Sequence, residues 1–207
     1  MLNLIRNAVK DSREEVAQFG EIAIDLATDN EAWANVPLVK YAVGLLKIKD
    51  AYKVNKLKRN YAAFIGSIDT LGPKEQKLLL DRLRSEGEDQ LSEDVAETIF
   101  DVIIEGHKPI KAKVLGNLLC ALARGDISKE DYNTMALMIQ ACSVAALQAL
   151  PKFLQGNNLK SHKSGMGAVP CEALLFSLGV GTRNGTMFRI DATGILMARH
   201  GFMVAVD

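Results

Sequence analysis

Apolar residues recur at helical spacing through almost all of the chain up to about Leu154, and this periodicity constrains the fold more than any other feature. An α-helix repeats about every 3.6 residues, so this spacing places apolar side chains on one face of each helix. Gly and Pro interrupt the pattern at Leu71-Gly72-Pro73, at Gly106 and at Pro109. The sequence therefore predicts an all-α fold, a bundle of six or seven helices.

Several helix ends in this region carry local start and stop signals. Pro109 is expected to begin a helix, because its missing N–H would be unpaired there anyway, and Arg124-Gly125 is expected to end it. Ser128 with Asp131 has the spacing of a capping box at the start of the next helix. Pro151 is expected to terminate that helix.

The composition changes after Leu154. Residues 155–170 are polar, rich in Gly, Ser and Asn, and without periodicity, so they are predicted to form a flexible loop. Beyond them the sequence predicts a short helix over 171–178, a β-hairpin turning at Asn184-Gly185, and a last helix over 193–200. The predicted organisation is a helical bundle over 1–154, the loop over 155–170, and a small helix-hairpin-helix unit over 171–207 packed on the bundle.

Charge and cysteine content narrow the class of protein. The 25 basic and 25 acidic residues leave a formal net charge of zero, so any binding of a polyanion must depend on a local patch. The first residues, MLNLIRNAVKDSREE, hold no apolar stretch long enough for a signal peptide, so none is expected. No uncharged run approaches the roughly 20 apolar residues that a spanning helix needs. Three well-separated cysteines are expected to be buried thiols in a reducing compartment: Cys120, Cys142 and Cys171. We expect a cytoplasmic protein.

A basic stretch over residues 36–61 offers one candidate binding site. On a helix, Lys49, Lys53 and Lys56 share a face, and Asn60 would extend that face by one turn. The opposite face would hold apolar residues, namely Tyr52, Leu57, Tyr61, Phe64 and Ile65. Such a helix could contact an anionic lipid surface or nucleic-acid phosphates. The favoured interpretation is an apolar face in the core and a solvated basic face.

The candidate anion or lipid contacts in this stretch are Lys49, Lys53, Lys56 and Arg59. A second, smaller cationic cluster lies in the predicted loop, where His162 stands among Lys160, Lys163 and Ser164. That cluster could receive an anion, but clusters of this kind are more often solvated loop surface.

Signals for catalysis are weak. The three histidines His107, His162 and His200 lie far apart, without Cys, Asp or Glu at the spacing of a metal motif. The glycines of 179–186 lack the lysine of a phosphate-binding loop and are better explained by a turn. No serine or cysteine stands in a recognisable nucleophile motif. We therefore predict no enzyme, and no catalytic, metal-binding or cofactor-binding residue.

Residues 171–200 have the helix, hairpin, helix order of the last part of a winged-helix module. In that comparison residues 171–178 would read bases, yet they carry no basic or amide side chain to do so. Only Arg183 and Arg189 on the hairpin could reach phosphate. A structural hairpin packed on the helices is favoured over a DNA reader.

Four segments together resemble a loosely defined set of bacterial helical proteins of unknown function. They are VPLV, IKDAYKVNKLKRNYAAFI, KAKVLGNLLCALARGDISKEDYNTMALMI and LLFSLGVGTRNGTMFRIDATGILMARHG, within about residues 33–200. In the last segment IDATG stands where that set has LT-x-x-G. The resemblance implies a place in bacterial accessory genomes, sometimes beside phage-defence or toxin and immunity systems, and it implies no catalytic residue.

These observations favour a non-enzymatic protein-interaction module in the cytoplasm, acting on a protein partner through grooves between helices or through the 155–170 loop. One alternative is a peripheral membrane binder that meets an anionic membrane through helix 36–61. Another is a nucleic-acid-binding protein with a wing-like C-terminal hairpin. Assembly of the chain into an oligomer also stays open.

Overall fold

The structure is a computed structural model that describes residues 51–83, 93–165 and 168–206. The chain divides into two compact units, Met1–Lys58 and Arg59–Asp207. The architecture below concerns the second unit together with the helix that leads into it. Predictions that fall on residues 1–50, among them the first part of the basic helix over 36–61 and the role of Lys49, lie outside the described residues.

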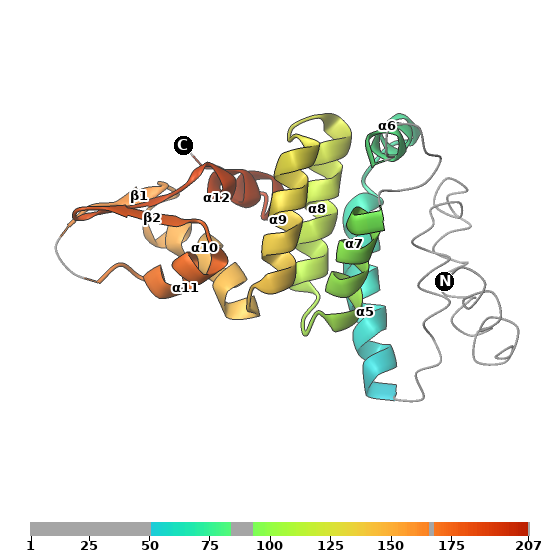
Figure 1. Ribbon diagram of the computed structural model, residues 1–207, viewed down its shortest axis with the longest axis horizontal. Coiled ribbons are helices and arrows are strands. Elements are labelled where there is room, and N and C mark those ends of the chain that lie inside the picture. The colour runs from blue at the N-terminus through green and yellow to red at the C-terminus, as the bar shows by residue number, and fades with distance from the viewer. Residues whose placement is uncertain (1–50, 84–92, 166–167, 207) are drawn as a thin grey trace, which may run out of the picture. The chain divides into compact units, whose positions relative to one another are not determined.

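Within the described residues, the helices before the C-terminal sheet are α5 (Ala51–Ile68), α6 (Pro73–Leu83), α7 (Glu93–Glu105), α8 (Ile110–Arg124), α9 (Lys129–Ala141) and α10 (Val144–Gly156). Helix α8 is central, since it packs against α6, α7, α9 and α10. Twelve of its fifteen residues are buried. Its apolar side chains therefore form much of the core, and the neighbouring helices cover it on several sides (Figure 1).

The predicted ends of α8 and the predicted start of α9 are confirmed. Helix α8 begins directly after Pro109 and ends at Gly125, which takes the left-handed conformation with φ 84°. At the start of α9, the Asp131 amide donates to Ser128 Oγ at 3.0 Å, and the Ser128 amide donates to Asp131 Oδ2 at 3.3 Å. This reciprocal pair is the expected capping box.

The prediction that Pro151 ends the helix begun at Ser128 is wrong. Helix α9 already ends at Ala141, and Ser143 caps a new helix, α10, by accepting a hydrogen bond from the Ala146 amide at 3.0 Å. Pro151 lies inside α10. The missing amide of Pro151 is therefore tolerated within α10, because buried residues on both sides of the proline hold the helix in place. These residues include Leu147, Leu150 and Phe153.

A three-stranded antiparallel sheet follows the helices. It consists of β1 (His162–Lys163), β2 (Gly181–Asn184) and β3 (Met187–Ile190), with β3 in the centre of the order β1-β3-β2. The predicted hairpin is confirmed as β2 and β3, but its two-residue connection is Gly185-Thr186, one residue later than the predicted Asn184-Gly185, because Asn184 still pairs with Met187. Gly185 has φ 59°. Strand β1 was not predicted, because two residues are too few to show the alternation of a strand.

Two helices and a π-helical turn complete the C-terminal region: α11 (Glu172–Leu178), α12 (Ala192–Leu196) and η1 (Met197–Gly201). The inner side of the sheet packs on helices through Phe188, whose ring meets Phe153 of α10 and Phe176 of α11 edge to face. A hydrogen bond joins α8 to η1, since the buried Asn117 of α8 donates to the Gly201 carbonyl oxygen at 2.8 Å. The terminal elements thus share a core with the helices.

The fold class predicted from the sequence is confirmed. The described chain is mostly helical, and its small sheet lies near the C-terminus as expected for a helical bundle with a C-terminal β-hairpin.

Candidate interaction surfaces

The structure describes the C-terminal half of the predicted basic helix. Lys53, Lys56 and Arg59 all lie in α5, where Arg59 is exposed and Lys56 is partly exposed. The side chain of Lys53 and all of Lys49 lie outside the description. A contact of these four residues with an anion or a lipid stays a prediction.

The predicted division of this helix into a basic face and an apolar face is wrong at its C-terminal end. Asn60, expected on the basic face, has 0% of its surface exposed, and Phe64, expected on the opposite face, has 1%. Lys56, Asn60 and Phe64 follow one another at four-residue steps and so lie along one side of the helix. That side turns inward because the Asn60 amide donates to the carbonyl oxygens of Ile103 and Gly106, at 2.9 and 2.6 Å.

A membrane span needs a helix of about 20 predominantly apolar residues. Within the described ranges, no single helix is long and apolar enough to cross a membrane. Helices α9 and α10 meet both needs only as a pair, and a break between them bends that pair by 118°.

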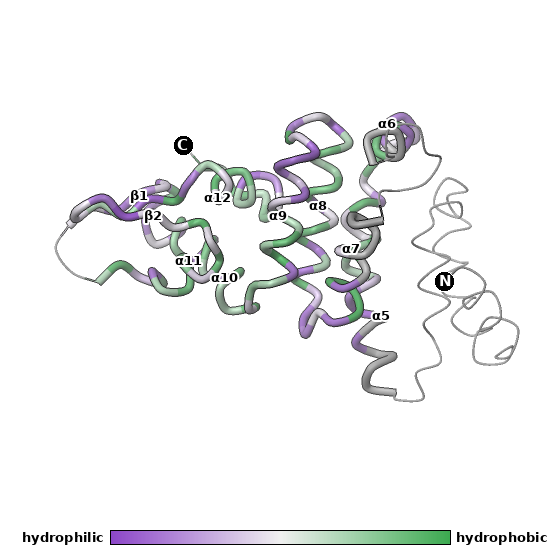
Figure 2. The backbone as a smooth tube through the Cα atoms, in the orientation of Figure 1, coloured by the Kyte–Doolittle hydropathy of each residue, from purple (hydrophilic) through white to green (hydrophobic). Residues whose placement is uncertain are grey.

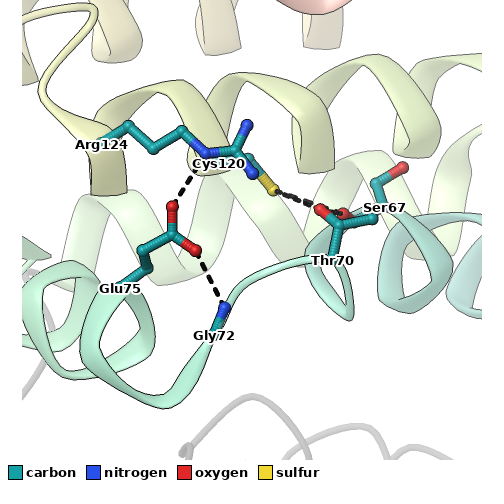
Figure 3. A network of polar contacts seen from close by, with 6 residues as sticks. All are labelled: Ser67, Thr70, Gly72, Glu75, Cys120 and Arg124. Atoms are coloured by element: carbon teal, nitrogen blue, oxygen red, sulfur yellow. Dashed lines mark hydrogen bonds and ion pairs between the residues drawn. The ribbon is translucent and has the colours of Figure 1, made fainter.

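One polar network joins α5, α6 and α8 (Figure 3). Glu75 accepts hydrogen bonds from the Gly72 amide at 2.9 Å and from Arg124 Nε at 3.0 Å, and together these lower the pKa of its carboxyl, the Gly72 bond most. Beside it, the Cys120 thiol donates to the Ser67 carbonyl oxygen at 3.3 Å. Burial raises the pKa of Cys120. The network connects the three helices, and its thiol stays protonated. These features fit a structural role better than that of a reactive centre.

A second polar cluster joins α7, α8 and α9. Lys111 is buried, with 8% exposed, and its Nζ donates to the Gln140 carbonyl oxygen at 2.9 Å near the end of α9, where a cation is favoured. The Gln140 side chain donates to Asp101 Oδ2 at 2.6 Å. Burial raises the pKa of the neighbouring Cys142 although Lys111 opposes the shift. This cluster also connects helices, and its thiol is buried.

Histidines and cysteines form no metal site in the part of the chain that the structure describes. His107, between α7 and α8, and His162 of β1 are exposed, and His200 of η1 is partly exposed. The expectation of buried thiols is confirmed for Cys120 and Cys142, but Cys171 is only half-buried. Cys171 occupies the N-cap position of α11 with a left-handed backbone, φ 62°, and makes no side-chain capping hydrogen bond.

An apolar surface is presented by α11. Leu175 and Leu178 are buried beneath the helix, while Leu174 and Phe176 keep 37% and 45% of their surface exposed. Beside them is an open hollow of about 530 Å³, lined by Val169, Cys171, Glu172, Ala173, Leu174 and Phe176. We call these six residues the α11 surface. A sequence signal for it exists, since residues 173–176 are apolar on every side of the helix, more than a core-facing stripe needs.

A polar surface lies on the sheet. Residues paired across an antiparallel sheet point to the same side, and the register pairs His162 with Arg189 and Arg189 with Thr182. Asn184 and Met187 form the next row on that side. All five are exposed, and we call them the outer sheet face. Figure 2 shows the hydrophilic course of β1 and β2 beside the apolar α11.

The predicted contacts on the hairpin are only partly brought together. Arg183 points to the helix side, where it pairs with Glu172 of α11 and donates to the Gly185 carbonyl oxygen. Arg189 points to the outer side with His162, a partner that sequence reasoning had assigned to a separate loop cluster. Thr182 was missed, because its place opposite Arg189 depends on the strand register.

Comparisons with protein-family models, with curated proteins and with solved structures gave no match.

Proposed function

We propose that the protein is a non-enzymatic interaction module that binds a partner protein through the α11 surface. The observation that carries the proposal is the pair of large apolar side chains, Leu174 and Phe176, exposed together beside an open hollow. Grouped apolar side chains at a surface mark interaction sites more often than single ones do.

The α11 surface is held rigid from below. Leu175 and Leu178 anchor the helix in the core, and Glu172 is paired with Arg183 of the hairpin. The Phe176 ring rests edge to face on buried Phe188, with centroids 5.6 Å apart. A surface that is already ordered loses little conformational entropy on binding, so more of the contact energy appears as affinity.

The chemistry of the surface indicates the kind of partner. Leu174 and Phe176 flank the buried Leu175 on α11, so a partner would cover each of them with its own apolar side chain. Full burial of an apolar side chain of this size contributes about 1.5–3 kcal/mol. The resemblance to bacterial helical proteins suggests components of phage-defence or toxin and immunity systems as the first partners to test. The membrane alternative depends on residues 36–61 and stays a prediction.

Site-specific photo-cross-linking tests the proposal. A photoreactive amino acid replaces Leu174 in one variant and Leu137 in a matched control, because Leu137 of α9 is also an exposed leucine, with 56% exposed. In host cells, we expect the first variant alone to cross-link to a defined protein, identified by mass spectrometry. A cross-link to a second copy would identify the chain itself as the partner.

A second variant tests whether the cross-link depends on the α11 surface. Phe176→Lys should abolish the cross-link formed at position 174, while the circular dichroism spectrum keeps its helical signal. Identical products at positions 174 and 137, or no product at position 174, would contradict the proposal.

A further inference from the structure

The outer sheet face gathers exposed polar groups from three strands that are distant in sequence. His162 comes from β1, Thr182 from β2 and Arg189 from β3, and the register places them in one row. Neighbouring strands lie about 4.8 Å apart, so the row spans roughly 10 Å. On the opposite side, Phe188 and Ile190 are buried, which fixes the direction in which Arg189 points.

The positive charge of this region is not balanced locally. Residues 157–190 contain four lysines and arginines, Lys160, Lys163, Arg183 and Arg189, and a single carboxylate, Glu172. Glu172 pairs with Arg183 on the helix side of the sheet. Directly after β3, the Asp191 carboxylate accepts a hydrogen bond from the Gly194 amide and caps α12. Lys163 and Arg183 both pair with Phe188 and so lie on the helix side of the sheet. Although the whole chain is neutral, the outer sheet face carries the cation Arg189, and the exposed Lys160 adjoins it.

The side chains on this face are hydrogen-bond donors of the kinds that contact phosphate. Arginine, threonine and asparagine side chains, all present on this face, are among those that hydrogen-bond to the DNA backbone. They stand on a small three-stranded sheet, and β-strands of such sheets can contact a groove of duplex DNA. The flat face offers one large apolar group, Met187, with 38% exposed, which is little for insertion into a lipid layer.

We propose that the outer sheet face, with Lys160, binds the phosphate backbone of duplex DNA without sequence preference. Sequence preference is not expected, because α11 presents Leu174 and Phe176 where a reading helix would present amide or basic side chains. This site lies on the other side of the sheet from the α11 surface. DNA binding here and partner binding at the α11 surface are therefore independent proposals, and each can fail without the other.

Fluorescence anisotropy with a labelled 20-base-pair duplex tests the proposal on the full chain. We expect binding at 50 mM salt with a dissociation constant on the order of 10⁻⁵ M, equal for unrelated sequences. Contact with two or three phosphates predicts a slope of log K against log salt of about −2 to −3. Lys160→Glu with Arg189→Glu should weaken binding at least about tenfold.

Matched controls separate the site from general charge. Lys74→Glu with Lys77→Glu changes the net charge equally at exposed positions of α6 and should leave binding unchanged. Arg189→Lys keeps the charge on the sheet and should retain binding, which guards against a folding defect in the reversed variant. Equal loss in the α6 control would overturn the site.

Three further outcomes would overturn the proposal. They are absence of binding to the duplex at 50 mM salt, equally tight binding to poly-glutamate, and binding to phosphatidylserine vesicles without binding to DNA. The second would indicate an unselective cationic surface, and the third a lipid headgroup site.

Discussion

Gly116 shows how tightly single residues determine the packing of α5 on α8. A Cβ at this position would lie 2.8 Å from Ser67 Cβ and 2.9 Å from the Phe64 carbonyl oxygen. Backbone cannot yield to so close an approach without moving a helix. We expect Gly116→Ala to lower the free energy of unfolding by about 1–3 kcal/mol, measured by urea denaturation.

Gly156 provides the matched control for that substitution. It is the last residue of α10, and a Cβ there would meet nothing within 4 Å. Gly156→Ala should leave stability unchanged or raise it by about 0.4–1 kcal/mol, since alanine restricts the unfolded chain. Equal urea midpoints for the two variants would contradict the close packing at Gly116.

At the scale of elements, Glu75 joins the α5–α6 turn to the end of α8. Hydrogen bonds from the Gly72 amide and then from Arg124 lower its pKa below the ordinary value of a glutamate. A lowered pKa in the folded state contributes stability above the unfolded pKa, near 4.3, and that contribution is lost as pH falls through the folded value. Glu75→Gln should therefore be less stable than wild type at pH 6, and the difference should shrink as pH falls below the ordinary glutamate value.

Urea denaturation at a series of pH values measures this difference. Arg124→Met distinguishes the two hydrogen bonds, because it removes the ion pair at 3.0 Å and leaves the Gly72 bond in place. Part of the pH dependence should then survive. If the difference in free energy of unfolding between Glu75→Gln and wild type is constant from pH 3 to pH 6, the carboxylate charge does not stabilise the contact between the α5–α6 turn and the end of α8.

At the scale of the whole unit, the sheet and the helices share one core through Phe188. This side chain is fully buried between Phe153 and Phe176, and α8 in turn holds η1 through Asn117. Phe188→Ala should cost about 3–5 kcal/mol and speed amide hydrogen exchange in α8 as well as in the hairpin. Its neighbour Met187, 38% exposed, is the control, and Met187→Ala should change stability by less than about 0.5 kcal/mol.

Faster exchange confined to residues 181–190 would contradict this shared core. The hairpin would then unfold as a separate unit, independent of the helices.

The sequence alone determined the helical class, several helix ends and the hairpin. Those features depend on groups a few residues apart, as in the Ser128–Asp131 capping box and the left-handed Gly125. Local hydrogen bonds and backbone sterics depend on neighbouring residues, and for that reason they could be predicted. The prediction that Pro151 ends a helix was wrong, because the nearby cap at Ser143 and the buried contacts of α10 outweighed one missing amide.

Only the tertiary structure decided which sides are buried and which distant residues meet. It turned Asn60 inward to the carbonyls of Ile103 and Gly106, more than 40 residues away. It also paired His162 with Arg189 and so assembled the outer sheet face. Burial and strand register depend on the sum of contacts over the whole core, and no short stretch of sequence contains that sum.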